Sequence, residues 1–208
     1  MKLFDATQTT LYIIIVFTNS VYTLAALFLP TVFLTKDVAG VWVGLVFAAY
    51  SMAVVAVSPF IGKILKNIGF ANLVAFGLVC MGISIIPFGY FLKLESPMSC
   101  VALGIVLRVM QGTASAAINS TCYSLAADKY PEQTEAMVGL LEAFSGLGGV
   151  AGLLGGAYIY ESMGYQFTFL MFGGMLPVVA IISRIIFGLQ EEEDSEKIKQ
   201  PLLGEYDD

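Results

Sequence analysis

The sequence predicts an all-α membrane protein, a polytopic bundle of six transmembrane helices. Of its 208 residues, 58% are hydrophobic and 12% are charged. Soluble domains carry about 25% charged residues, so this chain has too few polar side chains to cover a globule in water. Apolar runs of about 20 residues, the length needed to cross a hydrocarbon core, recur six times. They cover residues 11–34, 40–61, 71–92, 98–126, 136–160 and 166–188.

Charge divides the chain into three parts. Residues 1–10 form a predicted cytoplasmic N-terminus, residues 11–189 the membrane bundle, and residues 190–208 an acidic tail that we expect to be disordered and cytoplasmic. The tail segment 191–208 holds eight carboxylates against two lysines, and the rest of the chain is balanced. Nothing in this distribution indicates nucleic-acid binding. The lipid bilayer is the expected surrounding.

Basic residues predict the orientation of the bundle. Only Lys36 and Lys93 lie in the loops on one side, whereas the other lysines and Arg184 lie on the side of the two termini. Lysine and arginine are retained on the cytoplasmic side, so both termini are predicted to be cytoplasmic.

Several functional classes are disfavoured by composition. The sequence has no histidine, and Cys80, Cys100 and Cys122 have no spacing typical of a disulfide framework or a zinc site. No nucleophile–base pair or phosphate-cradling loop is visible. We predict neither a metal nor a cofactor, and no enzymatic activity.

The fourth apolar run contains a polar stripe. Arg108, Gln111, Ser115, Asn119 and Cys122 follow helical spacings of 3, 4, 4 and 3 residues and share one face. Because a charge within the membrane is costly, such residues usually face a bundle interior or a watery cavity. The pattern favours a cavity-lining arginine with a functional role. The alternative is a structural arginine bonded to backbone carbonyls of a neighbouring helix.

Further polar residues lie in other spans. Asn19 and Tyr22 in the first span and Tyr50 in the second are predicted to line one pocket with the Arg108 face, although each alone is more often an interhelical hydrogen bond than a ligand contact. Glu142 is the only carboxylate well inside a span. It is either a proton carrier or a structural partner of a backbone or hydroxyl group, and it lies too far along the bundle to pair with Arg108.

Glycines mark two further motifs. Gly62, Lys66 and Gly69 belong to a predicted tight, cationic turn between the second and third spans. Gly148, Gly152 and Gly156 recur every four residues in the fifth span. Glycine on one helix face lets two backbones approach closely in lipid, so this stripe predicts tight packing.

Three motifs, in order, resemble the major facilitator superfamily. They are the loop Gly62-x3-Lys66-Asn67-x-Gly69, the stretch "RVMQG" with Arg108 and Gln111, and the glycine-rich "GGVAGLLGG". The segment "VGLLEAFSGLGGVAGLLGGAYIYESMGYQFTFLMFG" resembles more specifically the vesicular amine and polyamine transporter-like branch. The resemblance covers residues 8–190.

This resemblance implies a fold and an activity. The fold is half of a major-facilitator bundle, built from paired three-helix units (a 3+3 repeat). The activity is secondary transport by alternating access, often as an antiporter that exchanges the solute for protons. The binding cavity of such proteins lies near the midplane. Its implied lining here is Asn19, Tyr22, Tyr50, Arg108, Gln111, Ser115 and Glu142.

The sequence departs from this family pattern in several places. Lys66 stands where the loop motif has an acidic residue, and Ala151-Gly152 stand where the fifth helix has Gly-Pro, which weakens the inference of antiport. The first span has no carboxylate to attract an amine, which disfavours a polycationic substrate. The family has twelve helices and this chain supplies six. We therefore expect a homodimer, a separately encoded second half, or a truncated product.

Two functions are consistent with these features. The leading hypothesis is a half-length secondary-active transporter for a small polar solute, with protons as the candidate coupling ion. The alternative is a non-transporting structural or assembly subunit of a larger membrane complex.

Overall fold

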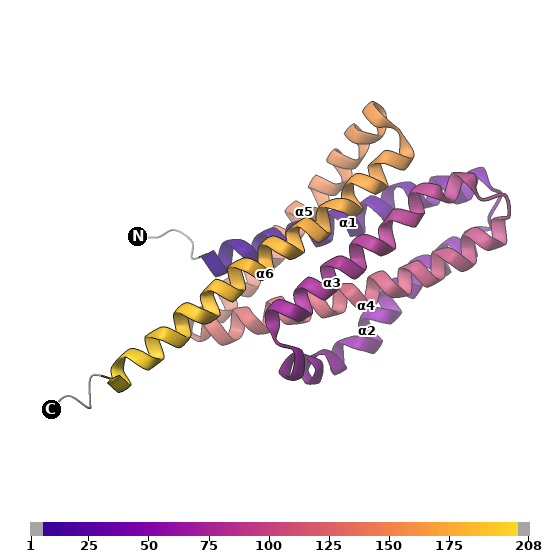
Figure 1. Cartoon of the computed structure of the whole chain (residues 1–208). Coiled ribbons are helices and arrows are strands. Elements are labelled where there is room, and N and C mark those ends of the chain that lie inside the picture. Colours follow the sequence, from indigo (N-terminus) through magenta and orange to yellow (C-terminus); the bar gives the residue numbers. More distant parts are fainter. Residues whose placement is uncertain (1–5, 204–208) are drawn as a thin grey trace.

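The structure is a computed structural model that describes residues 6–203, with side chains described up to residue 189. Within these residues, all regular structure is helical, and six helices are long and apolar enough to cross a membrane. They pack as an elongated bundle (Figure 1). The elements are α1 (Ala6–Thr35), α2 (Gly40–Ile68), α3 (Phe70–Ile85) continued by the 3-10 helix η1 (Ile86–Lys93), α4 (Pro97–Lys129), the short 3-10 helix η2 (Pro131–Gln133), α5 (Thr134–Met163) and α6 (Tyr165–Leu203). The prediction of an all-α bundle with six spans is confirmed.

The connection between α2 and α3 is tighter than predicted. α2 continues to Ile68, so Gly62 and Lys66 lie in its last turns rather than in a loop. The chain reverses at Gly69 alone, whose φ of 82° is a conformation that glycine adopts without a steric penalty. Gly62 has open space where a Cβ would stand, so no described neighbour packs against it.

At its C-terminal end, α6 continues to Leu203, beyond residue 189, where the predicted membrane bundle ends. The segment from 190 to 199 is rich in Glu, Lys and Gln, which favour helix, and it extends an already nucleated helix. The predicted N-terminal segment is shorter in the structure, because α1 begins at Ala6. Residues 1–5 and 204–208 lie outside the described part.

The helices pair in a pattern that repeats between the two halves of the bundle. The most extensive contacts join α1 with α5, α2 with α4, and α3 with both α4 and α6. The first three helices correspond in order to the last three, so that α1 matches α4, α2 matches α5 and α3 matches α6. Under this correspondence the α1–α5 pair matches the α2–α4 pair, and the α3–α6 pair matches itself. These three pairings are what two equivalent three-helix units produce, whereas the α3–α4 contact has a less extensive counterpart between α6 and α1.

The α1–α5 pair is held by backbone contact at the glycine stripe. A Cβ at Gly148 or Gly152 would lie closer than 3.0 Å to the carbonyl oxygen of Val16 or Ser20, respectively. Gly156 would meet the side chain of Leu24 equally closely. Ser20 Oγ donates a hydrogen bond to the Gly148 carbonyl at 2.8 Å. The structure places this stripe at the contact between α1 and α5.

The α2–α4 and α3–α6 pairs use glycine in the same way. A Cβ at Gly112 of α4 would lie closer than 3.0 Å to the Tyr50 carbonyl oxygen of α2. A Cβ at Gly82 of α3 would likewise lie closer than 3.0 Å to the Gly173 carbonyl oxygen of α6. Small residues let helices approach in lipid, where no hydrophobic force drives them together. These contacts position α2 over the polar face of α4.

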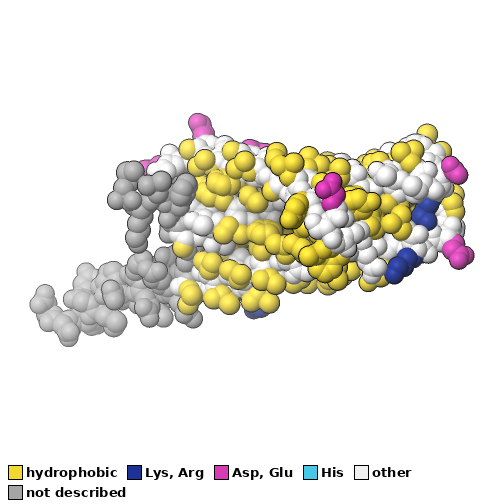
Figure 2. Space-filling view, turned by 90° about the horizontal axis from the view of Figure 1, so that it is seen from above, with side chains coloured by type: hydrophobic (Ala, Val, Ile, Leu, Met, Phe, Trp, Pro, Cys, Tyr) yellow, Lys and Arg dark blue, Asp and Glu magenta, His cyan; other side chains and the backbone are white. Residues whose placement is uncertain are grey.

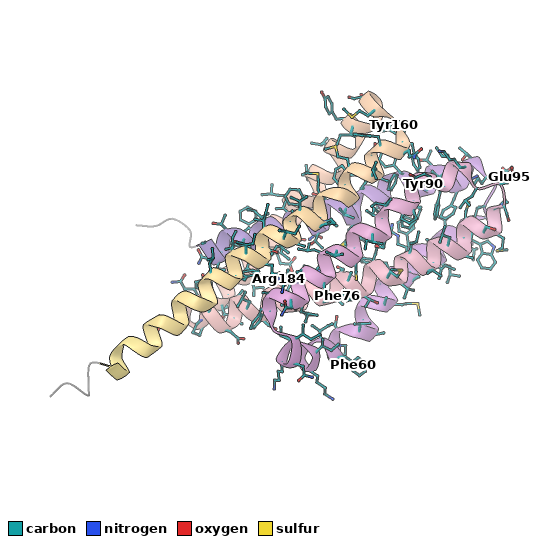
Figure 3. The ribbon with its side chains drawn as sticks, viewed as in Figure 1. Phe60, Phe76, Tyr90, Glu95, Tyr160 and Arg184 are labelled. Atoms are coloured by element: carbon teal, nitrogen blue, oxygen red, sulfur yellow. The ribbon has the colours of Figure 1, made fainter. Side chains whose placement is uncertain are left out.

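The outer surface suits a membrane. Hydrophobic side chains spread along most of the face shown in Figure 2. Tyr90 and Tyr160 lie toward the end of the bundle away from the termini, where Glu95 also lies, and Arg184 lies nearer the C-terminal end (Figure 3). Tyrosine is enriched at membrane–water interfaces, so these side chains are consistent with a spanning bundle.

Substitution of the packed glycines should destabilise the fold. Gly152→Ala forces the α1 backbone to shift, and overpacking of this kind costs about 1–3 kcal/mol. The matched control is Gly146→Ala, also in α5, where nothing lies within 4 Å of the added Cβ. Thermal unfolding in detergent should show a lower midpoint for Gly152→Ala and an unchanged or raised midpoint for Gly146→Ala. Equal midpoints for the two variants would contradict the close approach of α1 and α5.

Candidate functional site

Arg108 of α4 lies in the interior of the bundle and is 0% exposed. Aromatic rings surround its guanidinium. The ring centroids of Phe47, Phe88, Tyr22 and Tyr50 lie 4.8, 5.8, 5.9 and 5.9 Å from Cζ. Aromatic faces attract a cation, which offsets part of the cost of removing it from water. The predicted inward orientation of this face of α4 is observed.

The guanidinium makes one hydrogen bond. Nη1 of Arg108 donates to Oε1 of Gln111 at 3.2 Å. Nε and Nη2 of Arg108 and Nε2 of Gln111 are buried without a hydrogen-bond partner. Among the described residues, no backbone carbonyl accepts a hydrogen bond from the Arg108 side chain, whereas the structural alternative predicted carbonyls of a neighbouring helix. Buried donors without acceptors are costly, and such a group calls for an explanation.

A second polar cluster continues from Arg108 along α4. Tyr50 donates its hydroxyl to Ser115 Oγ at 2.7 Å, and Asn119 Nδ2 donates to the same oxygen at 3.0 Å. The rings of Tyr22 and Tyr50 are 4.7 Å apart. The structure therefore brings six of the predicted binding residues together. They are Tyr22, Tyr50, Arg108, Gln111, Ser115 and Asn119.

Asn19 is less closely joined to this cluster. Its Nδ2 donates to the Ile15 carbonyl of its own helix at 3.0 Å. Its amide is thereby satisfied locally, and no described bond connects it to α4. Asn19 lies one helical turn before Tyr22, so it stands beside the cluster rather than in it.

Glu142 lies on the outer surface of the described chain rather than in its interior. Its side chain is exposed in this chain, and it accepts a hydrogen bond from the Tyr123 hydroxyl at 2.6 Å. A hydroxyl is one of the two kinds of partner that the structural alternative predicted for this carboxylate. Arg108 is not its partner, as expected.

Sequence reasoning missed two of the rings around Arg108. Phe47 precedes Tyr50 by three residues and so shares its helix face, a signal that was present in the sequence. Phe88 lies in η1, where the chain changes from α-helix to 3-10 helix. Neither apolar periodicity nor motif spacing indicates where a ring in such a segment points.

Comparison with known proteins identifies the family. Residues 11–204 match the Major Facilitator Superfamily, and the chain belongs to it. This confirms the resemblance seen in the three motifs.

The relatives of this chain include the MFS-type transporter SLC18B1 of Homo sapiens, which is 25% identical over 175 residues, covering 84% of this chain and 38% of the human protein. The mouse protein of the same name (Mus musculus) is 28% identical over 152 residues, covering 73% of this chain and 33% of its own length. This chain therefore spans well under half of the length of the curated relatives it matches. These relatives fit the branch that the sequence resembles, and the six helices are consistent with half of the family's fold.

Removing the charge of Arg108 should stabilise the folded chain. A charge at the membrane centre is unfavourable by about 2.5–3.5 kcal/mol on insertion scales. A close cation–π contact stabilises it by about 0.5–2 kcal/mol, which is less than this cost. Arg108→Met keeps a similar volume, so its thermal unfolding midpoint in lipid nanodiscs should rise by a few degrees. Phe88→Ala, which empties the fully buried neighbouring site, should instead lower the midpoint. A loss in Arg108→Met as large as that in Phe88→Ala would identify the guanidinium as structural.

Proposed function

We propose that this chain is one half of a secondary-active transporter that moves a small polar solute across a membrane by alternating access. The observation that carries the proposal is the polar face of α4, where Arg108 and Gln111 are buried with free donor atoms. Ionisable groups inside membrane bundles mark solute and ion pathways. The relatives named as MFS-type transporters support the same class.

The proposed solute site is the cluster around Arg108. Arg108 and Gln111 supply donors, Ser115 and Asn119 extend the polar face, and Tyr22 and Tyr50 cover it from α1 and α2. Asn19 joins the lining when its amide releases the Ile15 carbonyl. Polar groups on several helices around one point are what a midplane transport site requires.

Proton coupling is proposed at Glu142. Its bond to the Tyr123 hydroxyl joins α5 to α4, so protonation of the carboxylate changes a contact between two helices. A second wall that covers Glu142 would desolvate the carboxylate and favour its protonated form. In this proposal, solute is exchanged for protons because the carboxylate is exposed to water on one side of the membrane and then on the other.

A second six-helix half is proposed to cover the face formed by α2 and α5. Ser51 of α2 and Glu142 of α5 are exposed there, and polar groups facing lipid are unfavourable. The outward side chains in the middle of α3 and α6, such as Phe76, Ile83 and Ile181, are instead apolar and suited to lipid. The partner is either a second copy of this chain or a separate chain.

The gate is proposed at the end of α2. Lys66 is exposed there, one helical turn before the reversal at Gly69, and Gly62 presents an open surface. The positive charges at this end support the proposal that the termini are cytoplasmic. The Gly148, Gly152 and Gly156 stripe serves as a surface on which α5 moves against α1 during the change of access.

Transport by the reconstituted protein tests the proposal. The protein is purified with any partner it retains, placed in vesicles containing a pH-sensitive dye, and supplied with a panel of small anionic, neutral and cationic solutes. We expect the native chain to move at least one solute, and Arg108→Met to stop this movement with an unchanged folded yield. Glu142→Gln should abolish solute-driven proton movement but retain solute exchange.

Glu161→Gln is the matched control for the carboxylate, because Glu161 lies at the far end of the same helix. It should leave both measurements unchanged. Normal transport by Arg108→Met would show that the buried guanidinium has no part in the solute pathway. If the native protein moved none of the solutes, the proposed class of function would be wrong.

Photo-cross-linking tests the second half. Leu153 lies about three turns from Glu142 on the same side of α5, and Phe76 lies on the outer surface of α3 (Figure 3). With benzoylphenylalanine in place of Leu153, irradiation of native membranes should yield a protein adduct. The same probe in place of Phe76 should yield lipid adducts only. Protein adducts from Phe76 and none from Leu153 would place the partner on the opposite face.

A further inference from the structure

The guanidinium of Arg108 has one complete edge without an acceptor. Nη1 is occupied by Gln111 Oε1, whereas Nε and Nη2 are buried and unpartnered. In a planar guanidinium, the N–H bonds of Nε and Nη2 point in the same direction from one edge. This is a geometry in which arginine holds both oxygens of a carboxylate. The free edge therefore fits a planar group with two acceptor oxygens.

Gln111 adds a donor to the same place. Its side-chain oxygen accepts from Arg108, so its Nε2 faces the interior as a donor without a partner. The unpaired side-chain nitrogens of this pair are thus all donors, and its one side-chain acceptor oxygen already serves Arg108. A ligand that completes these bonds has to supply acceptors.

The positive charge of Arg108 also favours a ligand that carries acceptor oxygens. Arg108 forms no ion pair with any residue that the structure describes, and its Nε and Nη2 are buried unpartnered. The surrounding rings of Tyr22, Phe47, Tyr50 and Phe88 carry no formal charge. In a low-dielectric interior, like charges repel strongly, so a cationic solute is disfavoured next to this guanidinium. A single negative charge neutralises it.

We infer that the solute carries a carboxylate, and that a monocarboxylate binds the Nε–Nη2 edge of Arg108 together with Nε2 of Gln111. This inference rests on the proposed transport function and names the class of its substrate. Because Arg108 is fully buried, the solute reaches it only when the rings of Tyr22 and Tyr50, which are half-buried and 4.7 Å apart, separate.

The test compares probes that differ in charge and share a skeleton. The purified protein, with any partner it retains, is titrated with acetate, lactate and benzoate, with the amides acetamide, lactamide and benzamide, and with benzylamine. Binding is measured by calorimetry and by the thermal unfolding midpoint. We expect at least one carboxylate to bind and raise the midpoint, whereas its amide and benzylamine do not.

Variants then locate the binding. Gln111→Leu removes one donor and should weaken carboxylate binding by about tenfold or more, and Arg108→Met should abolish it. Arg184→Met changes the only other arginine of the sequence, which is exposed near the end of the bundle, and should leave binding unchanged. If Arg108→Met failed to fold, the comparison of Gln111→Leu with Arg184→Met would decide the question.

Three results would overturn the inference. Amides that stabilise as well as the carboxylates would show that the free edge takes a neutral group or water. Carboxylate binding that survives both Arg108→Met and Gln111→Leu would place it elsewhere. Absence of binding by every carboxylate would indicate that the edge is filled within the assembled protein, by a carboxylate of the second half.

Vesicle transport separates this inference from the proposed function. If the protein moves a solute but only benzylamine binds, the carboxylate inference fails and the transporter proposal stands. If a carboxylate binds through Arg108 but no solute crosses the membrane, the site is a binding site and the transporter proposal fails.

Discussion

Backbone contact between α2 and α4 at Gly112 determines where the side chains of the site lie. A side chain at this position would collide with the Tyr50 carbonyl, so the two helices approach as closely as their backbones allow. In hydrocarbon no hydrophobic force drives helices together, and close packing of small residues takes its place. With the helices at this distance, Tyr50 reaches Ser115 and Phe47 covers Arg108.

The corresponding contact between α1 and α5 has a different outcome. There the glycine stripe also brings two backbones together, but the polar group at the contact is Ser20, whose single hydroxyl donor is shared between the Val16 and Gly148 carbonyl oxygens, each 2.8 Å away. Its hydrogen-bonding capacity is used within the interface. Around Arg108, in contrast, donors remain free. The two interfaces are related by the internal repeat, but only the one at Arg108 keeps hydrogen-bond donors free. Free donors distinguish a candidate binding site from a packing contact.

Much of the site could be predicted because helical periodicity determines which side chains share a face. The spacing of Arg108, Gln111, Ser115 and Asn119 placed them on one stripe, and membrane energetics placed that stripe inward. Periodicity does not determine which residue each polar side chain hydrogen-bonds to. Asn19 bonds to its own helix, and Glu142 is exposed beside Tyr123, because the neighbouring helices leave those positions at the edge of the bundle. The ring of Phe88 depends on a 3-10 segment that no periodic pattern describes.

The amino-acid sequence by itself determined that the protein lies in lipid, the number of its spans and the direction of the α4 face. These properties follow from composition and local spacing, because every backbone group in lipid must be satisfied within a helix. The family, in contrast, was indicated by the resemblance of three motifs. Only the tertiary structure decided which helices meet, how the rings enclose Arg108 and which donors stay free. Those features depend on distances between helices far apart in the chain, and these distances follow from glycine contacts that act jointly across three helix pairs.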